Sequence, residues 1–149
     1  MTERKLHAYE VLLRMAQVRE IRASVALAKA TDEERTRRAH RDDIGAAREA
    51  VTLASRLCVE DTATVDMARY EMLAVLDALL SDRLEEASQE HVSSLRTRDE
   101  SANANVMAKR YRERVEERTA DVGQSLYEVR SAQHQNEAVE LWLESKEGK

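Results

Sequence analysis

The feature that most restricts the fold of this chain is its shortage of residues that form turns or end helices. The 149 residues include no proline and only three glycines, Gly45, Gly123 and Gly148. A compact globular domain of this length would need connections of about 2 to 6 residues between its elements, marked by Gly, Pro, Asn or Asp. Charged residues make up 36% of the chain and aromatic residues 3%, a composition typical of long helices. We therefore expect an all-α fold.

Apolar residues recur seven apart, which is the spacing of helices that bury a narrow stripe against another helix. One series predicts a seam at Ile44, Val51, Cys58, Val65, Met72 and Leu79, with companion positions at Ala47, Ala54, Ala68 and Val75. An N-terminal series (Val11, Val18, Val25) and a C-terminal series (Ala108, Val115, Val122, Val129) follow other frames. We therefore expect the frame of the seam to change along the chain.

The best candidate for a turn is the segment "VEDTATVD", Val59 to Asp66, because Asp and Thr cap helix starts and compete with the helical backbone. The opposing observation is that the seam series runs through this segment. A single long helix would leave its stripe in water unless another chain covered it, so we favour a hairpin. The prediction is a long two-helix antiparallel coiled coil, one domain over residues 1–149, with helices at about 3–60 and 66–145 and a turn at about 60–66.

Motifs that carry chemistry are missing from the sequence. The four histidines never fall in an E-x-x-H or H-E-x-x-H arrangement, which predicts no metal site. Cys58 occupies a seam position, so a buried structural thiol is favoured over a nucleophile. Gly45 and Gly123 stand alone and form no phosphate-binding loop. We expect a protein that is not an enzyme and binds no cofactor.

The longest apolar stretch, Met72 to Leu76, is far shorter than the roughly 20 residues that span a bilayer. We expect a cytoplasmic protein without direct membrane insertion.

Three surface features stand out, and each has two interpretations. The basic run "RTRRAHR", Arg35 to Arg41, could bind phosphates, but without interleaved aromatics a solvated helix face is favoured over nucleic-acid binding. The segment "YEMLAVLDALLSDR", Tyr70 to Arg83, is apolar over too wide an arc for one seam, which indicates either a docking surface or local packing at the turn. Trp142 is either an anchor for a partner or a clasp on the N-terminal arm.

These features resemble those of the FliJ/YscO (SctO) stalk proteins of type III secretion. The resemblance rests on the N-terminal helix "VLLRMAQVREIRA", the polar break near the middle, and "ARYEMLAVLDALLSDR" after it. It covers nearly the whole chain in layout and length, although this chain has no aromatic at position 72 and carries Arg83 where the family often has His.

The resemblance implies a central stalk that links a hexameric secretion ATPase to the cytoplasmic domain of an export-gate protein, at the cytoplasmic face of the inner membrane. It also admits secretion chaperones as partners. It places the export-gate contact on Met72, Leu76, Leu79 and Arg83. The ATPase-facing residues would be Arg14, Arg19, Arg22 and Trp142.

Two other classes remain open. A self-assembling structural scaffold or tether unrelated to secretion would form stable dimers, whereas a stalk should be monomeric alone, because a ring pore admits one hairpin. A small secretion chaperone would be a compact α/β dimer, which the missing strand signals disfavour.

Overall fold

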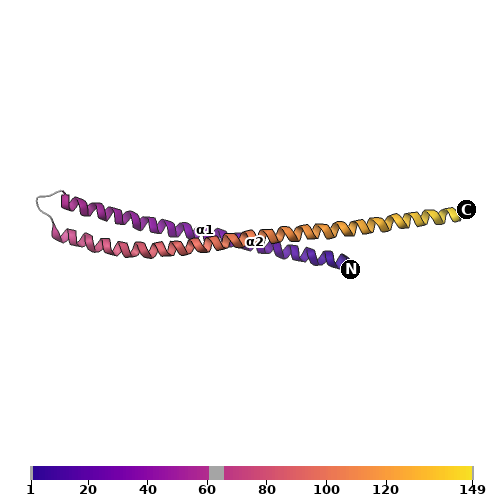
Figure 1. The fold of residues 1–149 in the computed structure, drawn as a ribbon, viewed down its shortest axis with the longest axis horizontal. Coiled ribbons are helices and arrows are strands. Elements are labelled where there is room, and N and C mark those ends of the chain that lie inside the picture. Colours follow the sequence, from indigo (N-terminus) through magenta and orange to yellow (C-terminus); the bar gives the residue numbers. More distant parts are fainter. Residues whose placement is uncertain (1, 61–65, 149) are drawn as a thin grey trace. The chain divides into compact units, whose positions relative to one another are not determined.

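Two long helices make up the protein in the computed structural model, which describes residues 2–60 and 66–148 and their side chains from Glu3 onward. Helix α1 spans Thr2–Glu60 and helix α2 spans Met67–Glu147, and the described residues contain no strand (Figure 1). The predicted all-α helical hairpin is confirmed. None of the described residues belongs to a helix long and apolar enough to cross a bilayer.

Contacts within the chain fall into two compact units. Unit 1 contains Met1–Ser24 and Ala104–Lys149, and unit 2 contains Val25–Asn103. We describe each unit by itself.

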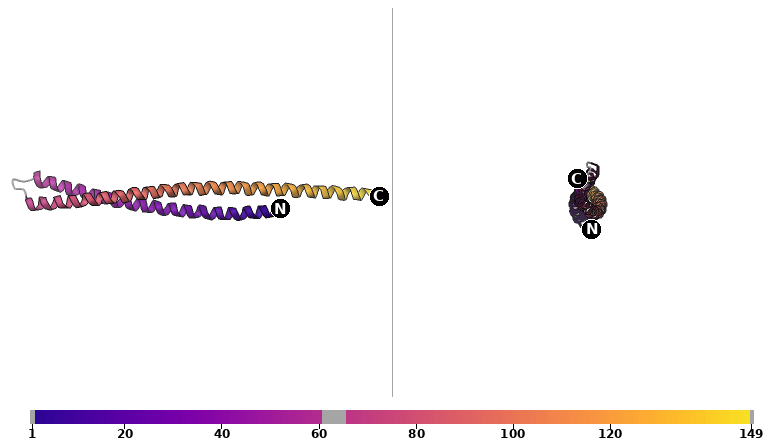
Figure 2. Two further views of the ribbon diagram at one scale, coloured as in Figure 1. Left: turned by 60° about the horizontal axis from the view of Figure 1, so that its bottom comes forward. Right: turned by 90° about the vertical axis from the view of Figure 1, so that its left-hand side faces the viewer.

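In unit 2 the two helices are antiparallel neighbours, and they lie side by side over this part of the chain in Figure 1 and in the left view of Figure 2. Two ion pairs fix the direction. Arg37 contacts Glu90 at 2.7 Å and Arg48 contacts Asp77 at 3.3 Å, so the chain number rises along α1 while it falls along α2. On both helices of unit 2, buried or half-buried residues recur at alternating spacings of three and four and form the seam. On α1 they are Ile44, Arg48, Val51, Ser55 and Cys58. On α2 they are Leu73, Asp77, Leu80, Leu84, Ala87 and His91.

In unit 1 the helices are also antiparallel, because Glu3 pairs with Arg130 and Glu20 pairs with Arg112. The same spacing of three and four continues through the residues that face the partner helix. These are Leu6, Tyr9, Leu13, Ala16, Glu20 and Ala23 of α1, and Asn105, Ala108, Arg112, Val115, Thr119, Val122 and Leu126 of α2.

The prediction that the frame of the seam changes along the chain is wrong. One frame of buried and half-buried residues runs through the described part of each helix. Of the N-terminal series, Val11, Val18 and Val25 are exposed, and the buried residue beside Val18 is Ala16. Ile44, Val51 and Cys58 do lie in the seam, as do Ala108, Val115 and Val122. Val129 is exposed.

The middle series fails after the turn. Met72 and Leu79 are exposed, and the seam residues are their neighbours Leu73 and Leu80. The companion positions Ala47, Ala68 and Val75 are exposed as well, while Ala54 is half-buried. The physical reason is that charged side chains occupy seam positions, so apolar residues alone give the wrong frame.

The start of α2 matches the expected capping chemistry. The backbone N–H of Arg69 donates to the Asp66 carboxylate at 3.2 Å, and the N–H of Tyr70 donates to the Asp66 carbonyl at 3.0 Å. The carbonyl of Asp66 therefore accepts the first bond of the helix, and its side chain satisfies one of the donors that the first turn leaves free. Most of the predicted turn, residues 61–65 with Val65 of the seam series, lies outside the described residues.

Candidate partner-binding surfaces

The four residues assigned to the export-gate contact lie together on one exposed face of α2. Met72, Leu76 and Leu79 have 66%, 40% and 52% of their surface exposed, and Arg83 is exposed too. Their spacings of four, three and four keep them on one stripe of the helix, one residue before the seam positions. We call Met72, Leu76, Leu79 and Arg83 the α2 stripe. It belongs entirely to unit 2.

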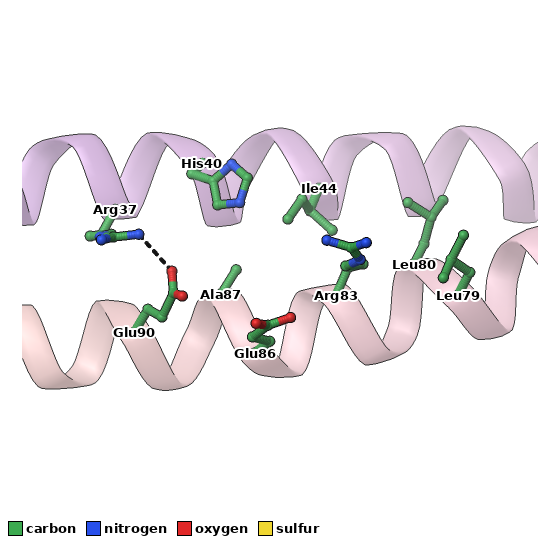
Figure 3. Close-up of a pocket in the computed structure, with 9 residues that line it drawn as sticks. All are labelled: Arg37, His40, Ile44, Leu79, Leu80, Arg83, Glu86, Ala87 and Glu90. Carbon is green, nitrogen blue, oxygen red and sulfur yellow. Dashed lines mark hydrogen bonds and ion pairs between the residues drawn. The ribbon is translucent and has the colours of Figure 1, made fainter.

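The α2 stripe borders a groove between the helices of unit 2, with a volume of about 490 Å³ (Figure 3). Leu79 and Arg83 form part of its α2 wall, and Arg37, His40 and Ile44 form its α1 wall. The ion pair between Arg37 and Glu90 spans the groove at one end. Arg83 and Glu86 line the same groove, and no ion pair joins Arg83 to a described side chain.

Sequence reasoning missed the α1 wall of this groove. Arg37 and His40 lie in the basic run Arg35 to Arg41, for which the sequence suggests only a phosphate site or a solvated face. The register between the helices brings them to the groove, since an antiparallel hairpin that pairs residue 48 with residue 77 also brings residue 40 close to residues 83–87. That register is known only once the two helices are paired.

The other arginines of the basic run bind groups of their own chain. Arg38 donates to the Glu34 carboxylate at 2.5 Å, and Arg41 contacts the His91 ring nitrogen Nδ1 at 3.0 Å. Arg35 lies 3.9 Å from Asp32. These contacts favour a structural role over phosphate binding for the run.

A buried polar cluster occupies the seam of unit 2, where Glu34 and His91 are only 1% and 6% exposed. The Nε2 of His91 and the Oε1 of Glu34 are 2.9 Å apart. Because Nδ1 of His91 faces the guanidinium of Arg41, the proton of a neutral ring belongs on Nε2, which then donates to Glu34. Arg98 adds a further positive charge at 3.7 Å from the same carboxylate.

The hydrogen bond from His91 lowers the pKa of Glu34, and burial of the carboxylate opposes this effect. The hydrogen bond and charge of Arg38 and the charge of Arg98 lower the pKa further. The carboxylate is therefore ionised in the interior of the hairpin.

A second charged contact lies in the seam of unit 1, where Nε of Arg112 is 2.5 Å from Glu20 and Nη1 is 2.6 Å from Glu116. The close ion pair with Glu20 raises the pKa of Arg112, which keeps this guanidinium charged.

The residues assigned to the ATPase contact do not form one site. Arg14, Arg19 and Arg22 are exposed on α1 in unit 1. Glu20 lies opposite Arg112, and Trp142 lies about 30 residues further along α2. At 1.5 Å per residue this separation is about 45 Å.

Trp142 is 55% exposed, and the ammonium of Lys146 lies 4.1 Å from the centre of its ring. Its position well past the pair of Glu3 with Arg130 disfavours a clasp on the described part of α1.

The described residues contain no group of three His, Cys, Asp or Glu side chains that could hold a metal ion. Comparisons with protein-family models, with curated proteins and with solved structures gave no match.

Proposed function

We propose that the protein is the non-enzymatic central stalk of a type III secretion export apparatus. In this function it links the hexameric secretion ATPase to the cytoplasmic domain of the export-gate protein. The observation that carries the proposal is the α2 stripe, because the residues that the FliJ/YscO resemblance assigns to the gate form a continuous exposed surface on an antiparallel hairpin.

The chemistry of the α2 stripe fits a protein partner. Three apolar side chains in a row remain in water in the isolated chain, and covering them would remove apolar area from solvent. Arg83 stands at the end of this row beside the groove, where its guanidinium can hold a carboxylate in a bidentate geometry. The apolar row supplies affinity and Arg83 supplies orientation.

The test is the double variant Leu76→Ala, Arg83→Ala. Both side chains are exposed, so the hairpin should melt at nearly the wild-type temperature. We expect calorimetric titration with the export-gate cytoplasmic domain of the same organism to show at least a tenfold loss of affinity, which corresponds to about 1.4 kcal/mol. Titration with the secretion ATPase should give wild-type affinity, because the arginines assigned to that contact are in unit 1.

A matched control is Val92→Ala with Arg96→Ala, an exposed apolar residue and an exposed arginine elsewhere on α2 in unit 2. This pair should bind the gate domain as the wild type does. Unchanged gate affinity in a folded Leu76→Ala, Arg83→Ala variant would overturn the proposal.

The alternative function, a self-assembling scaffold, is favoured by one observation. Val11, Val18 and Val25 are seven apart and all exposed, as expected of a helix that pairs with a further helix. Stable dimers of the isolated protein would support the scaffold.

A further inference from the structure

An apolar face of α1 in unit 1 points away from α2. Val11, Met15, Val18 and Ile21 have 42%, 50%, 46% and 64% of their surface exposed. Val18 follows the buried Ala16 by two residues, which is a rotation of about 200° around the helix. We call Val11, Met15, Val18 and Ile21, together with Arg14 and Arg22, the outer face of α1.

Folding of the hairpin does not explain the outer face. Valine and isoleucine are weaker helix formers than alanine, because their branched side chains lose rotamer freedom in a helix. Large apolar residues at solvent-facing positions also gain no burial from the hairpin. Alanine, lysine or glutamate at these exposed positions would favour the helix at least as well. The apolar residues of the outer face therefore indicate contact with something beyond the chain.

Positive charge predominates on this face. Arg14 and Arg22 flank Val18 at four residues on either side, and no ion pair joins either of them to a described residue. From Val11 to Ser24 the one acidic residue is Glu20, and its carboxylate binds Arg112 in the seam. Glu10, one turn before Arg14, is exposed, and its carboxylate lies 3.8 Å from the His7 ring. An occupant of the outer face therefore meets apolar side chains and an excess of positive charge.

We propose that the outer face of α1 packs against an acidic amphipathic helix of a partner protein. The spacing of its apolar residues fits the knobs-into-holes packing of a helix. Its arginines stand within the apolar row and can pair with flanking glutamates of such a helix. A lipid-binding helix would instead carry large residues such as Leu, Phe or Trp in a broad apolar face.

The FliJ/YscO resemblance also assigns Arg14 and Arg22 to the ATPase contact. The identity of the partner therefore rests on the proposed function, whereas the packing of an acidic helix on the outer face does not. The experiment therefore uses a peptide and no secretion protein. The probe is a three-heptad helical peptide with leucine at positions a and d and glutamate at e and g, whose own charges oppose self-pairing. The comparison peptide has lysine in place of each glutamate.

We expect the full chain to bind the glutamate peptide at least tenfold more tightly than the lysine peptide in calorimetric titration at low salt. Val18→Glu should weaken binding of the glutamate peptide at least tenfold. This variant should stay folded, because glutamate at position 18 lies four residues from both Arg14 and Arg22 and favours the helix. Val106→Glu introduces the same charge at an exposed valine of α2 in unit 1 and should leave binding unchanged.

Equal affinity for both peptides, no binding of either peptide, or wild-type binding by folded Val18→Glu would overturn the proposal. A dimer in sedimentation equilibrium that Val18→Glu dissociates would assign the face to a second copy instead. Sedimentation with phosphatidylserine vesicles, lost in Val18→Glu, would assign it to a lipid surface. Each of these outcomes leaves the export-gate titration untouched, so the inference and the proposed function can fail separately.

Discussion

At the scale of single residues, Glu34 shows how this hairpin tolerates an ionised carboxylate in its interior. Burial of an isolated carboxylate would raise its pKa and favour the neutral form. Here the hydrogen bond from His91 lowers the pKa, and the positive charges of Arg38 and Arg98 add to that effect. Removing one partner of such a cluster is costly because the others are left buried without a counter-charge.

We predict that Glu34→Gln destabilises the hairpin in a way that depends on pH. The folded-state pKa of Glu34 is below its ordinary value of 4.5, so its contribution to stability is present above that value. The contribution is lost as the pH falls through the folded-state pKa. The difference in unfolding free energy between wild type and Glu34→Gln should therefore be largest near neutral pH and shrink below about pH 4.5.

Urea unfolding followed by circular dichroism across this pH range measures the difference. The matched control is Glu33→Gln, which removes the same charge from the exposed neighbouring residue. It should change stability little at any pH. A difference for Glu34→Gln that does not vary with pH would contradict the prediction.

At the scale of the helices, the frame of the seam decides which of two neighbouring leucines stabilises the fold. Leu80 lies in the seam of unit 2 and Leu79 is 52% exposed. We predict that Leu80→Ala lowers the unfolding free energy by about 2 kcal/mol or more, as expected for a packed leucine. Leu79→Ala should cost about 0.5 kcal/mol or less. Chemical denaturation of the two variants checks this order, and the reverse order would restore the frame expected from the sequence.

Much of the element structure could be predicted from the sequence. Shortage of glycine and proline predicts the two helices, and the Asp/Thr segment predicts where they end, down to the cap made by Asp66. The seam frame could not be predicted from apolar spacing, because Arg48 and Asp77 occupy seam positions and neutralise each other there. That pairing exists only once the helices are side by side.

The candidate site was predictable in part for the same reason. Met72, Leu76, Leu79 and Arg83 lie on one helix, so their common face follows from helical geometry. Arg37, His40 and Ile44 join them only through the register between the helices. A single sequence contains no direct signal for that register.

At the scale of the whole molecule, we predict that the isolated protein is a monomer. The apolar seam of each unit is already covered by the partner helix of the same chain. Light scattering coupled to gel filtration should therefore report a mass near the 17.0 kDa of one chain. A persistent mass of two chains would favour the scaffold over the stalk.

The pair formed by Glu20 and Arg112 has a consequence for how such a sequence can change over evolutionary time. Both residues occupy seam positions of unit 1, and their side chains are 2.5 Å apart. A substitution that removes the Glu20 carboxylate leaves Nε of the half-buried guanidinium without its ion-pair partner, while Glu116 remains on Nη1, so the second substitution is favoured once the first has occurred. Related chains should therefore vary at positions 20 and 112 together, exchanging charge for apolar residues as a pair, rather than keep either residue unchanged.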